Sequence, residues 1–308
     1  MESIPINLNT SFVSSIKFDK ESLEQYRIQS AKHLSKYLGD KIALCLSGGI
    51  DSQCMVQCFL EANIPFDLYT LKFNKNLNEH DICTAYEYAD KHNLKLNLIE
   101  LDIIKFLTLE NLSYGQKYKS CSPQFNAHYK FFNMLKDKGY TGICAGGFVP
   151  IRSNKEWGIN YIYNSMNFIN YCAEEKIYAH GNFLSFYPEL TWAIALLTPG
   201  KTDYSKNTPW NGAYDNSEHG NMLRYYDKAI GYKKAGFDLI LQSNKLTGFE
   251  EVKKYYENIT GDGWTFEKRF RFPLNNLFSY KTKPKFIIDP EVLELLNSIN
   301  DNNTVPSL

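Results

Sequence analysis

Apolar residues in the first part of the chain alternate between helical and strand-like spacing. At Lys20–Leu38 they recur about once per helical turn and stop before a glycine, which predicts an amphipathic helix. The short apolar run Lys41–Leu46 predicts a buried strand. Helical spacing returns at Ser52–Ala62 and leads to a second predicted strand at Phe66–Phe73.

The same alternation continues to about residue 150. A helical pattern at His80–His92 precedes period-two alternation at Leu94–Leu101, which predicts a third strand. After a segment that we predict to be a loop, Ser122 and Pro123 are typical of the N-cap and first turn of another helix. Tyr140–Ala145 is a fourth predicted strand and ends on paired glycines.

This order of elements predicts an α/β fold with a parallel, doubly wound sheet. From Trp157 onward helices and aromatic-rich segments predominate, and no linker rich in Gly, Ser and Pro separates them from the sheet. We therefore expect a lead-in segment and helix at 1–38, an α/β domain at 39–155, and a mainly helical, aromatic-rich C-terminal region at 156–308. That last region should pack on the same domain as a cap that helps to bind the substrate.

Composition indicates a small ligand rather than a polyanion. The 308 residues include 34 Lys plus Arg and 34 Asp plus Glu, so the molecule has no net field to attract nucleic acid. No apolar run approaches the ~20 residues that span a bilayer, and the N-terminus lacks the features of a signal peptide. We expect a cytoplasmic protein that contacts neither membrane nor nucleic acid.

One basic stretch, 266–286, interleaves Lys and Arg with aromatic residues. A nucleic-acid surface can have this composition. A half-buried strand with a solvated face, followed by a Lys-rich loop, has it too, and the zero net charge favours that interpretation.

The segment at residues 44–53 has the sequence LCLSGGIDSQ, in which an apolar strand ends at a glycine-rich turn and a helix follows. Such a turn presents main-chain N–H groups and the positive end of a helix to an anion, and phosphate suits both. Gly48 and Gly49 permit a close approach of the backbone, while the hydroxyls of Ser47 and Ser52 can donate hydrogen bonds. Asp51 fits such a site as a magnesium ligand or as a helix-capping residue.

Residues 47–52, SGGIDS, resemble the SGGxDS signature of the PP-loop ATP pyrophosphatases. This superfamily includes asparagine, NAD and GMP synthetases, 7-cyano-7-deazaguanine synthase and tRNA thiolases. The resemblance covers about Gly39 to Pro150 and implies a HUP, or adenine nucleotide alpha hydrolase-like, fold. It also implies that a substrate oxygen attacks the α-phosphorus of ATP, and that a nitrogen or sulfur nucleophile then displaces AMP.

The resemblance also implies roles for individual residues. Pyrophosphate and Mg²⁺ would be held by Ser47, Gly48, Gly49, Asp51 and Ser52, with Asp51 as the metal ligand and Asp51 and Ser52 as catalytic residues. Adenosine would contact the end of the second strand, Leu71, Lys72 and Phe73. The glycine-rich end of the fourth strand, Gly146 and Gly147, would face the nucleotide.

Two basic residues are further catalytic candidates. Lys130, on the helix after Pro123, and Arg152, after the fourth strand, are placed where a cation could neutralise phosphate charge during the reaction. Cys121 lies just before a predicted helix N-terminus, where a thiolate is favoured. Core packing is expected for Cys54 and Cys58, on one face of a helix, and for Cys144, inside a strand.

These observations favour an ATP-dependent, AMP-forming enzyme that activates a small-molecule carboxylate or carbonyl oxygen for attack by ammonia or an amine. No glutaminase segment is visible, so ammonia would come from solution or from a partner protein. Two alternatives stay open: a PP-loop enzyme of sulfur transfer or nucleobase modification, and a non-catalytic nucleotide-binding module. The acceptor substrate is not specified by the sequence, and homo-oligomers are compatible with it.

Overall fold

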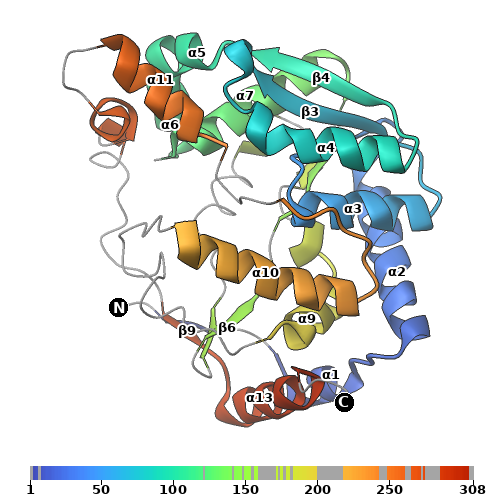
Figure 1. Cartoon of the computed structure of the whole chain (residues 1–308). Helices are drawn as coiled ribbons and strands as arrows, with labels where there is room; N and C mark the ends of the chain where they lie inside the picture. Colours follow the sequence, from blue (N-terminus) through green and yellow to red (C-terminus); the bar gives the residue numbers. More distant parts are fainter. Residues whose placement is uncertain are drawn as a thin grey trace.

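A computed structural model of the chain describes residues 3–5, 8–120, 122–140, 142–147, 149–153, 156–158, 171–172, 174–175, 178–180, 183–199, 218–242, 248–260, 265–271, 273–274 and 285–304. It contains a five-stranded parallel sheet, of which β3 and β4 are labelled at the upper right of Figure 1. The strands of this sheet, in spatial order, are β4 (Leu96–Leu101), β3 (Asp67–Phe73), β2 (Ile42–Cys45), β5 (Gly142–Ala145) and β8 (Tyr178–His180).

The sheet confirms the predicted fold class. Its first four strands along the chain have the spatial order 3-2-1-4, as in Rossmann and HUP-like folds. All pairs are parallel, and β2 lies between β3 and β5, with Ala43 opposite both Asp67 and Ile143. The fifth strand, β8, comes from the C-terminal region and was not predicted, because three residues are too short to show a periodicity.

Helices cover both faces of the sheet. The helices of the first half are α1 (Thr10–Ser15), which lies away from the sheet, α2 (Lys20–Leu38), α3 (Ile50–Glu61), α4 (Glu79–Lys91), α5 (Ile103–Leu109), α6 (Asn111–Tyr118) and α7 (Pro123–Asp137). The described helices of the C-terminal region are α9 (Pro188–Leu197), α10 (Glu218–Lys234), α11 (Glu250–Thr260) and α13 (Pro290–Thr304). None of the described helices is long and apolar enough to cross a membrane.

Smaller elements complete the described chain. Two 3-10 turns, η1 (Asn74–Asn76) and η2 (Phe183–Ser185), precede α4 and α9 respectively. β1 (Ser3–Pro5) pairs in parallel with β9 (Lys285–Ile287), and β6 (Ile151–Ser153) pairs antiparallel with β7 (Glu156–Gly158).

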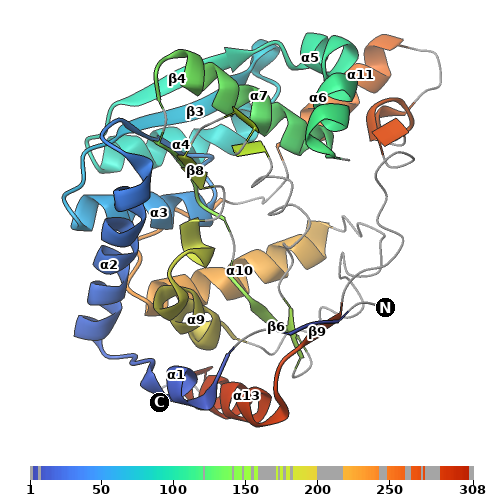
Figure 2. The ribbon, with the colours of Figure 1, turned by 180° about the vertical axis from the view of Figure 1, so that it is seen from behind.

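Alternation along β2 divides the core into two layers. Leu44 and Leu46 pack with α2, α3 and α4 on one face, whereas Ala43 and Cys45 pack with α5, α6 and α7 on the other. Figures 1 and 2 show these two helical layers from opposite sides. Buried residues of α9 and α10 join the first layer, and aromatic residues of α11 join the second. The helical C-terminal part therefore carries buried aromatic clusters on both sides.

The segment after β4, predicted as a loop, instead forms α5 and α6. Asp102 caps α5 by accepting a hydrogen bond from the Lys105 amide at 3.0 Å. In α6, Gly115 lowers helix propensity, yet a Cβ there would lie 2.3 Å from Leu274 Cδ2. Tertiary packing thus requires the glycine that obscures the helical pattern in the sequence.

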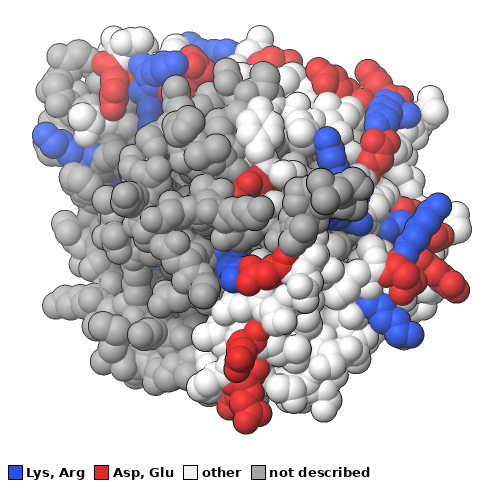
Figure 3. Space-filling model, turned by 60° about the horizontal axis from the view of Figure 1, so that its bottom comes forward, with Lys and Arg blue, Asp and Glu red and all other residues white. Residues whose placement is uncertain are grey.

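The predicted half-buried strand in the basic aromatic stretch is also wrong for its described part. Glu267–Arg271 forms a short π-helical turn, labelled η4, in which Phe266 and Phe270 are buried and Lys268 and Arg269 are exposed. The two phenylalanines are four residues apart, which is helical spacing, so apolar residues still face inward and charges outward. Residues 275–284 of this stretch lie outside the described residues. On the face shown in Figure 3, acidic and basic side chains lie interspersed over the described surface.

Candidate functional site

The glycine-rich turn connects β2 to α3 at the carboxyl end of the sheet. Gly48 has a φ of +84°, and a Cβ there would lie 2.8 Å from the Asp81 carbonyl oxygen and 3.0 Å from the Ala85 nitrogen. Both atoms belong to the backbone of α4, so the neighbour has little freedom to move. Gly48 is therefore needed for its conformation and for the close packing of the turn against α4.

Hydroxyl groups hold the turn in shape. Ser52 Oγ donates to the Gly49 carbonyl oxygen at 2.8 Å and accepts from the Ser47 amide at 3.2 Å. The two serine hydroxyl oxygens lie 3.2 Å apart. Ser47 and Ser52, expected to contact phosphate directly, thus also order the loop from within.

Several amides of the turn have no acceptor. In the part of the chain that the structure describes, the N–H groups of Gly48, Ile50 and Asp51 donate no hydrogen bond. Two of them belong to the first turn of α3, a helix of 12 residues whose N-cap, Gly49, supplies no side-chain cap. Unsatisfied amides at a helix N-terminus are the groups that bind phosphate in other proteins.

The end of β5 packs against this first turn. A Cβ on Gly146 would lie 2.5 Å from both the Asp51 carbonyl carbon and the Ser52 nitrogen, and Gly147 has a φ of +80°. The structure therefore brings together residues 47–52 and 146–147, which are far apart in sequence.

Asp51 already faces a cation of the chain itself. The ammonium of Lys228, on α10, lies 2.7 Å from Asp51 Oδ1, and the Tyr232 hydroxyl donates to the same oxygen. The Lys228 side chain is only 9% exposed and that of Asp51 22%. Asp51 Oδ2 has no hydrogen bond within the described chain.

Sequence reasoning missed Lys228 and Tyr232. With Tyr225 they occupy positions i, i+3 and i+7 of α10, one face of a helix. Burial raises the pKa of Tyr225 to about 12, and Asp51 adds to this effect, while the hydrogen bond from the Gln242 amide at 2.9 Å opposes it. A lysine between two tyrosines on a buried face was the available signal, because a lysine is almost never buried without a partner.

The end of β3 is occupied by a side chain from the same chain. Asn78 accepts from the Phe73 amide at 2.7 Å and donates to the Leu71 carbonyl oxygen at 2.8 Å. The side chains of Leu71 and Phe73 are buried in the second core layer, and Lys72 lies 3.7 Å from Glu79. An adenine base bound here would use groups other than these two main-chain atoms or displace Asn78.

Lys130 and Arg152 are engaged elsewhere. Lys130 donates to Glu110 at 2.6 Å. Burial lowers the pKa of Lys130, but the hydrogen bond to Glu110 and the nearby Tyr114 and Asp137 together raise it by more, so the ammonium stays charged. Arg152 is buried, and it donates to Asn300 at 2.7 Å and to Asp301 at 2.6 Å on α13. Their described partners lie at the junction of α5 and α6 and on α13, rather than in the glycine-rich turn.

The described cysteines of α3 and β5 are core residues, as expected. Cys54, Cys58 and Cys144 are fully buried, and burial raises the pKa of each thiol. Cys121, the candidate reactive thiol, lies outside the described residues.

A metal ion at this site would be coordinated by Asp51 and by the phosphate oxygens of a bound substrate. Among the residues with described positions, no group of three or more His, Cys, Asp and Glu could hold a metal. Mg²⁺ is usually bound through one or two carboxylates together with phosphate oxygens and waters, so a single carboxylate beside a phosphate site fits its chemistry.

A separate hollow lies at the opposite, amino-terminal edge of the sheet. It has a volume of about 290 Å³ and is lined by Phe66, Asp67, Leu68, Tyr69, Leu94, Lys95 and Asn97. None of the sequence-predicted site residues contributes to it.

Comparisons with known proteins leave the family of this chain open. No protein-family model matches the sequence, and no curated protein matches it either.

Proposed function

We propose that the chain is an AMP-forming enzyme of the PP-loop type that adenylates a small molecule. A carboxylate or carbonyl oxygen of the substrate attacks the α-phosphorus of ATP, and pyrophosphate leaves. Ammonia or an amine then attacks the activated carbon, and AMP leaves with the former substrate oxygen. The adenylyl group makes this second displacement feasible, because AMP is a far better leaving group than hydroxide.

The observation that carries this proposal is the set of unsatisfied amides in the glycine-rich turn. Gly48, Ile50 and Asp51 offer three N–H groups at the N-terminus of α3, at the carboxyl end of the sheet's central strand. Open α/β sheets bind ligands outside this end. A pyrophosphate group would satisfy these donors and benefit from the helix dipole.

Asp51 supports a role for a divalent cation. It is an acidic residue in the first turn of α3, next to the amides that would hold the anion. A carboxylate alone would repel a phosphate, whereas Mg²⁺ between them would neutralise charge on the phosphates. Asp51 and the phosphates of the nucleotide would hold the Mg²⁺ ion.

The buried cysteines of β2 and α3 do not support sulfur transfer, whereas Cys83, on α4, is exposed. Sulfur transfer requires an accessible thiolate. Cys54, on the same helix as Asp51, is fully buried, and burial raises the pKa of its thiol. A non-catalytic module would bind ATP without releasing pyrophosphate, which the following experiment distinguishes.

The test uses candidate substrates labelled with ¹⁸O in the carboxylate. The protein is incubated with ATP, Mg²⁺, ammonia and each labelled acid in turn, and the products are analysed by mass spectrometry. We expect AMP and pyrophosphate in equal amounts, with one ¹⁸O atom transferred to AMP. Label in AMP identifies attack by the substrate oxygen and excludes simple hydrolysis of ATP.

Two results would contradict this proposal. Formation of ADP and orthophosphate as the only products would exclude cleavage between the α and β phosphates. ATP binding with no turnover across carboxylates, amides and nucleobases would favour the non-catalytic module instead.

A further inference from the structure

Lys228 is a buried cation that contacts Asp51, although the two residues are 177 positions apart in the sequence. Its ammonium lies 2.7 Å from Asp51 Oδ1, and Tyr232, one turn later on α10, donates to the same oxygen. Desolvating a lysine is costly unless a partner compensates it. The pair therefore holds α10 against the first turn of α3.

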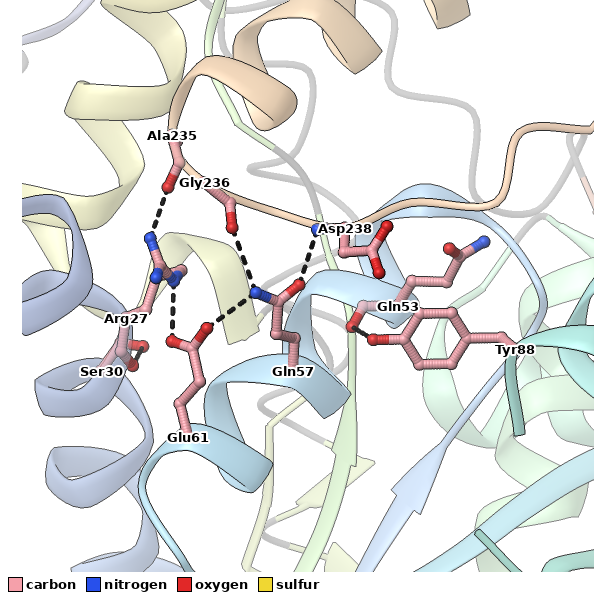
Figure 4. A network of polar contacts seen from close by, with 9 residues as sticks. All are labelled: Arg27, Ser30, Gln53, Gln57, Glu61, Tyr88, Ala235, Gly236 and Asp238. Carbon is pink, nitrogen blue, oxygen red and sulfur yellow. Dashed lines mark hydrogen bonds and ion pairs between the residues drawn. The ribbon is translucent and has the colours of Figure 1, made fainter. Parts of the chain in front are cut away.

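A polar network fixes the end of α10 relative to α2 and α3 (Figure 4). Arg27 donates to the Ala235 carbonyl oxygen at 2.6 Å and to Glu61 at 2.7 Å. Gln57 donates to the Gly236 carbonyl oxygen at 3.2 Å and accepts from the Asp238 amide at 2.9 Å. The position of Lys228 is thus set by the fold and not by its ion pair alone.

Gln53 connects this same segment to the glycine-rich turn. Its side-chain nitrogen donates to the carbonyl oxygens of Gly48 and Ile240, each at 2.8 Å, and its oxygen accepts from the Ile240 amide at 2.9 Å. The Tyr88 hydroxyl donates to the Gln53 carbonyl oxygen at 3.1 Å. The turn, α3 and the chain after α10 are therefore parts of one hydrogen-bonded unit.

This arrangement places two cations in competition for one carboxylate. Asp51 is the residue suited to hold a divalent metal, and Lys228 occupies one of its oxygens in the chain alone. A metal on Oδ1 would displace the ammonium, and a metal on Oδ2 would repel it across the same carboxylate. An anion bound by the adjacent amides would offer the displaced ammonium a new partner of opposite charge.

We propose that Lys228 is a tethered counter-ion with two partners: it neutralises Asp51 when no metal and nucleotide are bound, and it neutralises phosphate when they are. Only the second partner of Lys228, the phosphate, rests on the proposed function. This dual role makes Lys228 a residue that weakens binding of a free divalent cation and strengthens binding of pyrophosphate. A lysine with a purely structural role would not affect the two ligands in opposite directions.

The test measures two affinities in the full chain without turnover. Binding of Mn²⁺ alone is followed by electron paramagnetic resonance, and binding of pyrophosphate alone by calorimetry. For Lys228→Met we expect Mn²⁺ to bind roughly tenfold more tightly and pyrophosphate roughly tenfold more weakly, because one nearby positive charge is removed. Lys233→Met, an exposed lysine of the same helix, is the matched control and should change neither affinity.

Lys228→Arg and Tyr232→Phe cover the case in which the methionine variant does not fold. The arginine variant keeps the charge and should keep the affinity for pyrophosphate, whereas Tyr232→Phe removes one donor from Asp51 and should strengthen Mn²⁺ binding. Parallel loss of both affinities, or no change in either, would overturn the inference. Absence of pyrophosphate binding in the unmodified chain would instead overturn the proposed function, while the Mn²⁺ measurement would still test Lys228.

Discussion

The two edges of the parallel sheet differ in how their polar groups are satisfied. At the amino-terminal edge, the Tyr140 hydroxyl donates to Asp67 and lies 3.1 Å from the Tyr69 hydroxyl, and Asn97 donates to Leu68 at 3.1 Å. At the carboxyl edge, the side-chain oxygens of Asn74 and Gln242 are buried, and no described residue donates to them. Three amides of the glycine-rich turn also have no acceptor among the described residues.

This difference is one reason why we propose that the ligand binds at the carboxyl edge. The hollow of about 290 Å³ lies at the amino-terminal edge, next to the paired side chains of Asp67, Tyr69 and Asn97. Buried polar groups are costly when unsatisfied, so groups left without partners indicate an external one. We therefore expect the ligand at the carboxyl edge and not in the hollow.

The largest expected effect is on the rate of AMP formation when one carboxylate at each edge of the sheet is neutralised. Asp51→Asn should lower the rate of AMP formation by about 100-fold or more, since losing one preorganised charge partner costs roughly 2.7–4 kcal/mol. Asp67→Asn, the same change at the opposite edge, should leave the rate nearly unchanged. Steady-state assays of both variants measure this, and near-normal turnover of Asp51→Asn would remove Asp51 from the mechanism.

Glycine-to-alanine substitutions compare how tightly the backbone is packed at the two edges. A side chain at a positive φ costs roughly 1–2 kcal/mol. At Gly48 overlap with the backbone of α4 adds to this strain, so Gly48→Ala should lower the free energy of unfolding by about 3 kcal/mol. At Gly139, also with positive φ, a Cβ would meet only the flexible Lys41 ammonium, at 3.5 Å. Urea unfolding should show the smaller loss for Gly139→Ala, and equal losses would contradict the packing argument.

Acid sensitivity should arise partly at the carboxyl edge. Burial lowers the pKa of His128 to about 4, against a modest opposite effect of Asp81. Between pH 6.5 and 4 the unfolded chain therefore binds the extra proton, so this part of the stability is present above pH 6.5 and is lost as the pH falls.

His128→Gln should reduce that loss by about 2 kcal/mol, since one pKa unit corresponds to about 1.4 kcal/mol. Unfolding free energies measured from pH 7 to 4.5 test this, with the exposed His33→Gln as control. An unchanged pH dependence in His128→Gln would show that the ring is accessible to protons in the folded state.

The smallest expected effect concerns the hollow. Lys95→Ala combined with Asn97→Ala should alter ATP-dependent AMP formation by less than about twofold, because surface substitutions away from a site cost only ~0.5 kcal/mol. A larger increase in the Michaelis constant for ATP would indicate that the nucleotide binds at the amino-terminal edge and would reverse the comparison.

Local patterns predicted the sheet and the turn. Apolar periodicity located β2, β3, β4 and β5, and Ser122 caps α7 as expected, accepting from the Phe125 amide at 3.4 Å. These features depend on neighbouring residues, which a sequence displays directly.

Long-range features could not be predicted in this way. Lys228 contacts Asp51 only because α10 folds back over α3, and Asn78 reaches the end of β3 through a tight turn. Arg152 follows β5 in sequence, but it pairs with Asp301 on α13, 149 residues away. Periodicity specifies which face of a helix is apolar, but not which distant side chain meets it.

The sequence separation between Asp51 and Lys228 also sets a delay between their synthesis on the ribosome. These residues are 177 positions apart, so at 5–20 residues per second roughly 10 to 35 s of synthesis separate them. During this interval the nascent chain can form the turn and α3, but the carboxylate lacks its lysine. Completion of the site therefore depends on a late event in folding, and the emerging protein exposes an uncompensated acidic group until α10 arrives.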